Sequence, residues 1–470
     1  TVYGNYGFDK KQPRDFYKTE SNPYDPIVQN RDSSFWSNNR LESLNKDEKG
    51  IYQLLDTLKT VPKFKSYYNL VSILGSGYVE IDKWNMDVGS VYDVFGYNQA
   101  EGPRLRLGSR TYFGENDLWR LEGYMAYGFS DQKFKYGTSG KFLLDKKSRL
   151  IISGGNRRDI EQLGVSLTAT NDVLGRSIAS SSLVTVGANN RLTNINLSKL
   201  DFEMEPITNL RIGVGGTFRT LSSALPDDFS LDYIDPEEPS GIASTIRQFD
   251  FNALLIYTPG KRTIGYGVER RTINDNYSTL LLNYTKGTEG VFGSDFDYSK
   301  VQFAYSQPWQ IGGFGRLYST LEVGKTFGAV PLGLLNVIPG NQTFFSNYGT
   351  FPNLDFYEFV TDTYVALHLQ HNFNGRLFAR IPLLRKLNLR EVVGLRGVWG
   401  TLSDENIALS APAAINTPLQ APDDKVYYEY SFGIGNIFKI LRIDFNFRGN
   451  YLDAPDARPF SITGTFGFDF

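Results

Sequence analysis

Apolar and polar residues alternate with a period of two along most of this chain, from about Trp84 to the last residue. The clearest stretch is KILRIDFNFRGNY (439–451), in which Leu, Ile and two Phe occupy every second position and Arg, Asp and Asn lie between them. Successive side chains of a β-strand point to opposite faces of the sheet. The pattern therefore predicts strands with one apolar, aromatic-rich face and one charged face.

The alternation predicts seventeen strands separated by turn residues. Bacterial single-chain barrels have an even number of strands, so we expect sixteen, with one early segment outside the barrel or wrongly split. In that register the long stretch 222–244 falls on the side where short turns are expected. The seventeen segments lie near residues 84–95, 103–114, 117–129, 133–144, 148–158, 189–204, 207–221, 245–258, 261–273, 277–287, 296–308, 314–327, 357–373, 389–402, 424–434, 438–451 and 459–470.

A transmembrane antiparallel β-barrel satisfies both faces of these strands. A soluble sheet must cover its aromatic face, and almost no helical pattern is available to do so; a β-sandwich stays open, although so many strands would be unusual. The charged face, with Arg442, Asp444 and Arg448, is unsuited to a dry core because an unpaired buried charge costs several kcal/mol. We expect an all-β fold of about sixteen strands, with a polar lumen and lipid outside.

The N-terminal part of the chain follows a different pattern. After a polar, turn-rich stretch, apolar residues recur at helical spacing and predict one amphipathic helix near residues 46–61. Asn45 and Glu48 form a capping start, and Pro62 ends the pattern. We expect this helix to pack on a neighbouring domain, with binding to a membrane surface as the alternative. The apolar residues are Ile51, Leu54, Leu55, Leu58 and Val61.

These patterns divide the chain into two parts. Residues 1–78 form an N-terminal segment with the helix, which we expect in the periplasm, and residues 79–470 form the barrel. The chain starts at Thr1 rather than Met, and we interpret it as a processed or partial product.

Composition narrows the function classes. The 470 residues carry a formal net charge of −2, which lacks the basic field of a nucleic-acid-binding protein. Cys is absent, which excludes disulfides and Cys-ligated zinc. No run of eighteen or more apolar residues predicts a transmembrane helix. The mean hydropathy of −0.31 is compatible with a membrane barrel, because a barrel carries its apolar band on alternate residues.

The last eleven residues, FSITGTFGFDF, continue the alternation to the carboxylate. We expect Phe466 and Phe468 to face lipid, with Thr463, Thr465 and Asp469 towards the lumen. The ending resembles the C-terminal signal by which bacterial barrels are recognised and inserted by the barrel-assembly machinery. The resemblance implies this role for Phe466, Phe468 and Phe470. A soluble edge strand is the alternative, although an exposed aromatic edge invites aggregation.

Three long stretches resemble a family of Bacteroidota outer-membrane proteins described only as a domain of unknown function. They are FWSNNRLESLNKDEKGIYQLLDTL (35–58), WNMDVGSVYDVFGYNQAEGPRLRLG (84–108) and GSDFDYSKVQFAYSQPW (293–309). The resemblance covers most of the chain and implies a barrel in the outer membrane of a Gram-negative cell. Members usually carry an N-terminal carboxypeptidase-regulatory-like β-sandwich, which is not seen in this sequence.

A more distant resemblance is to the Omp85 superfamily, whose barrels insert or translocate proteins. A strand at 314–327 is followed by a long segment near 329–356, and five more strands then follow. In Omp85 barrels the corresponding sixth extracellular loop folds into the lumen. Its Arg-Gly-aromatic tip, which pairs with an Asp, is replaced here by Pro339-Gly340-Asn341, and the facing GLRGVWG has no Asp. The resemblance thus implies a lumenal loop whose lock is absent or rebuilt.

Catalytic or metal-binding groups are not evident. His368 and His371, three apart on a strand, face opposite sides and cannot share a metal; Asp362 is about 20 Å from His368 along the strand. The acidic loop 226–240 fits no EF-hand spacing and is interpreted as solvated, with a calcium site as the alternative. TPGKRT (258–263) is interpreted as a turn rather than a phosphate loop. We expect no enzyme activity and no cofactor.

Six charged residues share the predicted inner face. They form either a salt-bridged ladder that keeps the barrel rigid or a selectivity lining for anionic solutes. They are Arg390, Arg396, Glu429, Arg442, Asp444 and Arg448.

The leading hypothesis from sequence is a barrel that aids export or assembly of outer-membrane or surface proteins, as a possible subunit of a larger envelope complex. It rests on the Omp85-like order of the last six strands. The alternatives are a pore or transporter for small solutes and a plugged structural or docking barrel. The expected partners are outer-membrane lipid and lipopolysaccharide, the barrel-assembly machinery during insertion, and other envelope proteins.

Overall fold

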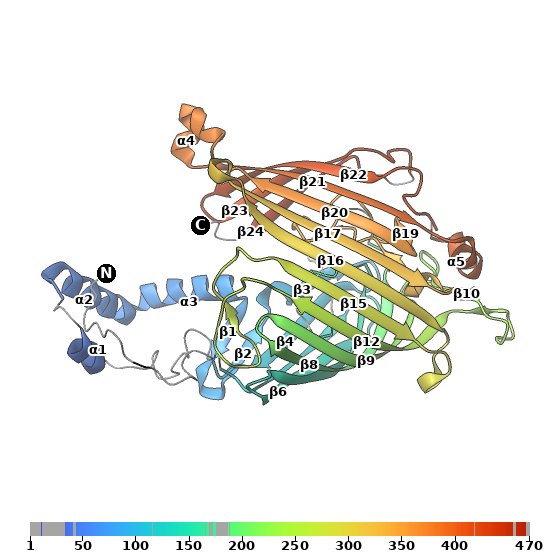
Figure 1. Ribbon diagram of the computed structural model, residues 1–470, viewed down its shortest axis with the longest axis horizontal. Helices are drawn as coiled ribbons and strands as arrows, with labels where there is room; N and C mark the ends of the chain where they lie inside the picture. Colours follow the sequence, from blue (N-terminus) through green and yellow to red (C-terminus); the bar gives the residue numbers. More distant parts are fainter. Residues whose placement is uncertain are drawn as a thin grey trace.

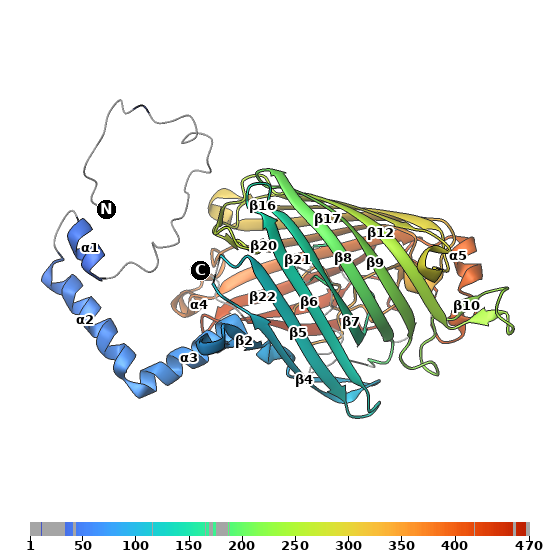
Figure 2. The same ribbon diagram turned by 90° about the horizontal axis from the view of Figure 1, so that it is seen from below.

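The computed structural model describes residues 11, 33–40, 44–114, 116–164, 166–168, 173, 174, 187, 189–417, 419–454 and 457–466. Most of the regular structure in these ranges is β-strand, and the strands curl into a barrel (Figures 1 and 2). None of the helices in these ranges is long and apolar enough to cross a membrane.

Three helices precede the barrel: α1 (Ser33–Asn39), α2 (Lys46–Thr60) and α3 (Pro62–Ser76). The predicted capping box is present: the Asn45 side chain accepts from the Glu48 N–H (2.8 Å), and the Glu48 carboxylate accepts from the Asn45 N–H (2.9 Å). Pro62 does not end the helical region. It opens α3, because a first-turn proline loses no helical hydrogen bond. The sequence analysis predicted one helix in this part of the chain and missed α1 and α3.

Eighteen described strands form one antiparallel sheet. Most neighbours in the wall are also neighbours in sequence, which is the arrangement of an up-and-down barrel. The strands are β1 (Tyr78–Ile81), β2 (Met86–Gly89), β3 (Phe95–Asn98), β4 (Gly102–Thr111), β5 (Trp119–Gly128), β6 (Phe134–Asp145), β7 (Leu150–Glu161), β8 (Thr193–Ile207), β9 (Leu210–Ser223), β12 (Thr245–Tyr257), β15 (Thr279–Gly287), β16 (Tyr298–Gln310), β17 (Arg316–Phe327), β20 (Thr363–Asn372), β21 (Arg390–Thr401), β22 (Tyr427–Ile437), β23 (Leu441–Arg448) and β24 (Phe460–Phe466).

These eighteen strands occupy sixteen positions in the wall. β2 and β3 pair with successive parts of β4 and therefore share one position. β1 pairs only with β2, on the edge away from β4, and is a four-residue strand added at the edge of the sheet. Removing one position for each leaves sixteen. The expected all-β barrel of about sixteen strands is confirmed.

The surplus predicted strand is the segment 261–273, not an early segment. It contains β13 (Thr263–Ile264) and β14 (Arg271–Thr272), which pair only with each other. When this segment is removed from the strand count, the connections before it and the connections after it change ends relative to one another. The long connection 224–244 then joins β9 to β12 on the long-loop side, which resolves its unexpected place in the predicted register.

The burial pattern is that of a membrane barrel, apolar outside and polar inside. Along β22 and β23 the polar residues Glu429, Asp444 and Arg448 are buried, whereas Tyr430 and Phe432 are exposed. The same alternation is visible in parts of β4, β5, β6 and β8. A charged interior with an exposed aromatic exterior is stable only where lipid covers the outside.

The barrel has two distinct ends. The terminal end carries β1, the end of β24 and α4 (Pro382–Leu387); the loop end carries α5 (Asp404–Leu409) and β10 (Tyr233–Ile234) (Figure 1). Long connections at the loop end are residues 162–192, 224–244, 328–362 and 402–426. β10 pairs there with β11 (Ile242–Ala243).

Candidate functional site

The connection between β17 and β20, residues 328–362, folds into the barrel and is called the lumenal segment below. It contains a short helix, Leu332–Leu334, and the pair β18 (Asn336–Val337) with β19 (Val360–Thr361). Most of its side chains are buried, including polar Asn341 and Asn353. The sequence analysis expected this segment inside the lumen, and the structure has it there.

An apolar core closes the loop end around this segment. Val330, Leu332 and Phe356 of the lumenal segment pack with Phe229 and Leu231 of the connection 224–244. The rings of Phe229 and Tyr357 lie 4.5 Å apart, and both side chains are fully buried. Such a core excludes water from the region that it fills.

Charged side chains of β22 and β23 hold the lumenal segment against one wall. Arg448 donates to the Glu358 carboxylate (2.7 Å) and to the carbonyl of Asn353 (3.3 Å). Glu429 accepts from the N–H of Asn353 (2.9 Å) and from the hydroxyl of Tyr427 (2.6 Å). These are charge-assisted bonds in a buried setting, where each is strong and costly to break.

Arg458, which precedes β24, adds a third anchor. It lies 3.0 Å from the carboxylate of Asp355 and donates to the carbonyls of Leu354 (2.7 Å) and Asn341 (3.0 Å). The acids Asp355 and Glu358 therefore belong to the segment, and the arginines belong to the wall. In the lock that the Omp85 resemblance implies, the loop carries the arginine and the strand carries the acid. Here the lumenal segment carries the acids and its partners carry the arginines.

The structure brings five of the six predicted lumen residues to this wall. Arg396, Glu429 and Arg448 are directly opposite one another across β21, β22 and β23. Arg442 pairs with Asp444 (2.8 Å). Arg396 donates to Asn446 (3.4 Å).

Arg390 is separate, because it lies at the first position of β21, at the terminal end. The prediction missed the acids Asp355 and Glu358 and the partner Arg458. They could have been noticed as charges within or beside segments that are otherwise apolar.

The edge of β24 that faces away from β23 carries no strand in the described part of the chain. Arg448 N–H bonds the carbonyl of Pro459, so odd-numbered residues of β24 point their backbone groups towards β23. Phe460, Ile462, Gly464 and Phe466 therefore point theirs to the free edge. Phe466 is 68 % exposed, whereas Phe468 and Phe470 lie outside the described residues.

The other end of the sheet is also open in the described residues. The bond from the N–H of Arg106 to the carbonyl of Val94 turns the backbone groups of Phe95 and Tyr97 away from β4, and no strand pairs with them. β1 covers the edge of β2 only. The barrel thus has a seam between β24 and β1–β3 that no described strand pair closes.

A short piece of the lumenal segment reaches this seam. Gly464 N–H donates to the carbonyl of Phe344 (2.8 Å), and Ser346 N–H donates to the carbonyl of Gly464 (2.9 Å). The result is a parallel bridge between Phe345 and Gly464. The Ser346 hydroxyl also bonds Thr463 (3.0 Å) and Asp444 (3.3 Å) inside the barrel. Phe344 and Phe345 remain 47 % and 45 % exposed.

The wall on the far side of the seam has its own buried ion pairs. Arg104 of β4 binds Asp159 of β7 (2.6 Å) and Glu101 (3.0 Å), and all three side chains are at most 1 % exposed. Lys135 also pairs with Glu101 (2.9 Å). Buried ion pairs therefore lie on both flanks of the seam inside the barrel.

The hairpin β13–β14 lies across the terminal end. Tyr266 N–H bonds the Asn116 side chain (2.9 Å), and Val268 N–H bonds the carbonyl of Asp117 (2.7 Å). Glu269 pairs with Arg120 of β5 and Lys141 of β6. This connection runs between β12 and β15, so its contacts reach strands several positions away in the wall.

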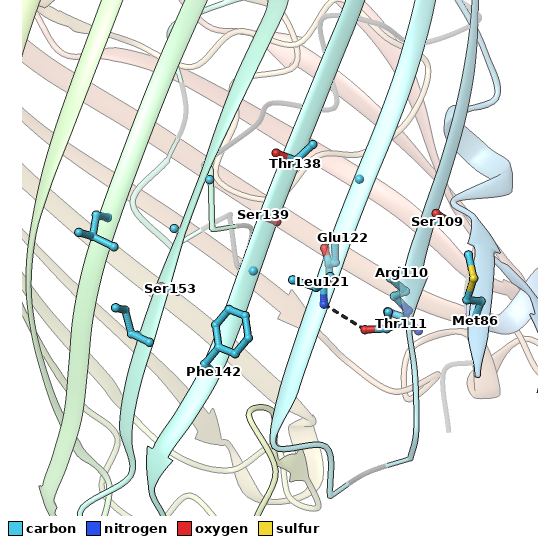
Figure 3. Close-up of a pocket in the computed structure, with 16 residues that line it drawn as sticks. Met86, Ser109, Arg110, Thr111, Leu121, Glu122, Thr138, Ser139, Phe142 and Ser153 are labelled. Carbon is cyan, nitrogen blue, oxygen red and sulfur yellow. Dashed lines mark hydrogen bonds between the residues drawn. The ribbon is translucent and has the colours of Figure 1, made fainter. Parts of the chain in front are cut away.

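The outer wall carries a hollow of about 630 Å³ over β4 to β8. Leu121 and Phe142 line it from the lipid-facing side (Figure 3). The β4–β5 ladder ends beside it, where the Thr111 hydroxyl accepts the N–H of Leu121 (3.0 Å). The lining also includes the charged and polar residues Arg110, Glu122 and Ser139.

The remaining candidates do not assemble a reactive site. His368 stacks near Phe351 (4.9 Å between ring centroids), and His371 contacts the carbonyl of Phe314 (2.7 Å). Residues 235–241, at the tip of the hairpin β10–β11, are mostly exposed. Residues 258–262 form a turn as expected. Among the described residues, no group of three or more His, Asp or Glu could hold a metal ion.

The strand wall, its apolar outside and polar inside, and the lumenal segment within it define a transmembrane β-barrel with an occupied lumen. Residues 225–404, which include the whole lumenal segment, match the C-terminal domain of a family of unknown function (DUF5686). The expected resemblance to a family of unknown function is thus found over this range. No curated protein matches the sequence.

Solved structures with similarity to this barrel belong to two kinds of protein. BamA of Haemophilus ducreyi, in a form lacking POTRA domains 1–3, is 13 % identical with a TM-score of 0.46, over 79 % of this chain and 69 % of that one. CdiB of Acinetobacter baumannii is 11 % identical with a TM-score of 0.38, and the alignment covers 79 % of this chain and 57 % of CdiB. OccK10 (OpdN) of Pseudomonas aeruginosa is 12 % identical with a TM-score of 0.31, over 81 % and 95 %.

Proposed function

We propose that this protein is an outer-membrane barrel that assists the export or assembly of outer-membrane or surface proteins, without enzymatic chemistry of its own. The residues before β1 lie in the periplasm, and the partners are other envelope proteins. The organism belongs to the Bacteroidota. The observation that carries the proposal is the seam, where two edges of the sheet have no strand partner in the described residues.

An unpaired strand edge binds extended polypeptide. It presents a row of N–H and C=O groups, which another chain can pair with by adding a strand. Most barrels remove such edges by complete closure. Here the edge positions Phe95, Tyr97, Phe460 and Ile462 also carry apolar, exposed side chains, which suit a partner that enters from the lipid.

The pore alternative meets an obstacle at the loop end. A sixteen-stranded wall is wide enough for an aqueous channel, but the lumenal segment and the apolar core around Phe229 and Tyr357 fill that mouth. The plugged docking barrel remains the second candidate, because the same plug supports it. The two candidates differ in whether the seam contacts other membrane proteins during their assembly.

Site-specific photo-crosslinking tests the proposal in growing cells. A photoreactive phenylalanine analogue is placed at Ile462 or Tyr97, at the seam, and at Leu282 on β15 as a control with matched exposure (43, 42 and 44 %). We expect newly made membrane proteins to be captured at the two seam positions and not at Leu282. Depletion of the protein should lower the amounts of the captured species in the outer membrane. Equal capture at all three positions, or unchanged amounts on depletion, would refute the role.

A further inference from the structure

We infer that residues Phe344–Ser346 are a resident occupant of the β24 edge, which an incoming amphipathic strand displaces. The inference rests on the proposed function and adds the kind of partner and the surface that it binds. The surface is the free edge of β24, centred on Gly464. The partner is an extended polypeptide with apolar side chains towards lipid and small polar ones towards the lumen.

The bridge itself has the geometry of strand addition. Gly464 uses both its N–H and its C=O, to Phe344 and Ser346, as it would with a neighbouring strand. Ser346 turns inwards to Thr463 and Asp444. The residues 344–346 therefore already occupy the position that a further strand would take beside β24.

The occupant is exposed, whereas the residues that anchor it on either side are buried. Residues 344–349 are exposed or half-buried, whereas Asn341–Thr343 and Thr350–Leu354 on either side are buried. Arg458 holds the flanks through the carbonyls of Asn341 and Leu354. The exposed stretch can therefore detach from β24 while the buried anchors stay in place.

An incoming strand has more of the edge available than the resident uses. The backbone of the resident bonds Gly464 alone, whereas Phe460, Ile462 and Phe466 point backbone groups to the same side without a strand partner in the described residues. A longer extended chain can add bonds at these positions and replace the short bridge. The exchange needs no change in the β23–β24 pairing.

Engineered disulfides in this cysteine-free chain measure the exchange directly. The pair Ser346→Cys with Thr463→Cys replaces side chains whose oxygens are 3.0 Å apart and reports the seated occupant. The pair Asn336→Cys with Thr326→Cys, whose side chains bond at 3.2 Å, ties the same segment to β17 and serves as the control. The probe is the synthetic peptide FSITGTFGFDF, with a scrambled peptide beside it, added to the purified barrel in detergent.

We expect the peptide to slow disulfide formation at least fivefold in the seam pair and to leave the control pair unchanged. Equal rates with FSITGTFGFDF and with the scrambled peptide would overturn the inference. The measurement uses no cellular activity. If the depletion experiment fails while the peptide still displaces the occupant, the proposed cellular role is wrong and the edge-binding surface stands.

Two proline variants test the bridge independently. Gly464→Pro removes the N–H that Phe344 accepts and leaves the pairing with β23 intact, because that N–H points to the free edge. Ile462→Pro removes an N–H on the same edge, for which the described residues provide no partner in another segment. We expect Gly464→Pro to lower the yield of the seam disulfide severalfold and Ile462→Pro to leave it unchanged. Equal yields in the two variants would count against the bridge.

Discussion

Single residues of the inner wall are explained by their partners in the lumenal segment. The sequence predicted Glu429 and Arg448 on the inner face from strand alternation alone. It left open whether they form a rigid ladder or line a passage for solutes. Their bonds to Asn353 and Glu358 assign them to the attachment of the plug, a role that alternation does not encode.

The buried pair Arg448–Glu358 gives a test at this scale. The two side chains are 0 % and 6 % exposed, so Glu358→Ala leaves an unpaired buried charge. We expect a loss of about 3–5 kcal/mol in the free energy of unfolding, measured by urea denaturation in detergent. Lys286→Ala, which breaks the exposed pair with Asp297, should cost about 0–1 kcal/mol. Similar losses in both variants would show that Arg448 does not anchor the segment.

Among the elements, α5 holds the start of the lumenal segment through hydrogen bonds, and this group of contacts around Asp362 and Asn406 is called the clamp below. Asn406 of α5 accepts from the N–H of Val330 (2.9 Å) and donates to Asp362 (3.3 Å). Asp362 also accepts from the N–H of Ser403 (2.7 Å) and the hydroxyl of Thr401 (3.1 Å). The Asp362 carboxylate, together with Asn406, therefore connects both ends of the lumenal segment to α5.

Asp362 makes this clamp dependent on pH. Burial raises the pKa of Asp362, but hydrogen bonds from Ser403, Thr363 and Thr401 outweigh it and hold the pKa below its ordinary value of 3.8. A depressed pKa means that the ionised group stabilises the folded state above about pH 4, and that this contribution is lost as the pH falls through the folded pKa. We expect Asp362→Asn to lower the melting temperature at pH 6 and to reduce its further fall between pH 4 and pH 2.

The exposed Asp227→Asn is the matched control for this prediction. It should leave the melting temperature and its pH profile as in the parent protein. If Asp362→Asn had the same profile as the parent, the carboxylate would not be the pH-sensitive part of the clamp.

The strand elements show how far local pattern is informative. Sixteen of the seventeen predicted segments correspond to wall strands, because alternation follows directly from the two environments of each strand. Segment 261–273 also alternates, but its strands are two residues each and pair only with each other. Its contacts with Asn116, Asp117 and Glu205 come from distant strands, which the local pattern does not show.

For the whole molecule, the occupied lumen predicts an electrically closed barrel. In planar bilayers we expect no steady open channel from the intact protein. Replacing residues 331–360 with a short Gly/Ser linker removes the plug and should produce large, stable conductance steps, because a sixteen-stranded wall encloses a water-filled space. Removal of the exposed tip 235–241 is the control and should leave the bilayer current unchanged. Steady channels in the intact protein would favour the pore alternative.

The sequence by itself determined the fold class, the inner and outer faces, and the presence of a long segment between two strands. These follow from period-two alternation and segment length, which are local properties. Tertiary structure alone decided the reversed ion pairs, the closed loop end and the bridge from Phe345 to Gly464. Each of these depends on which distant segments meet inside the barrel, and backbone hydrogen bonds at a strand edge carry no side-chain signature. The ending FSITGTFGFDF thus predicts a strand, but only the folded barrel reveals that one edge of that strand is left for a partner.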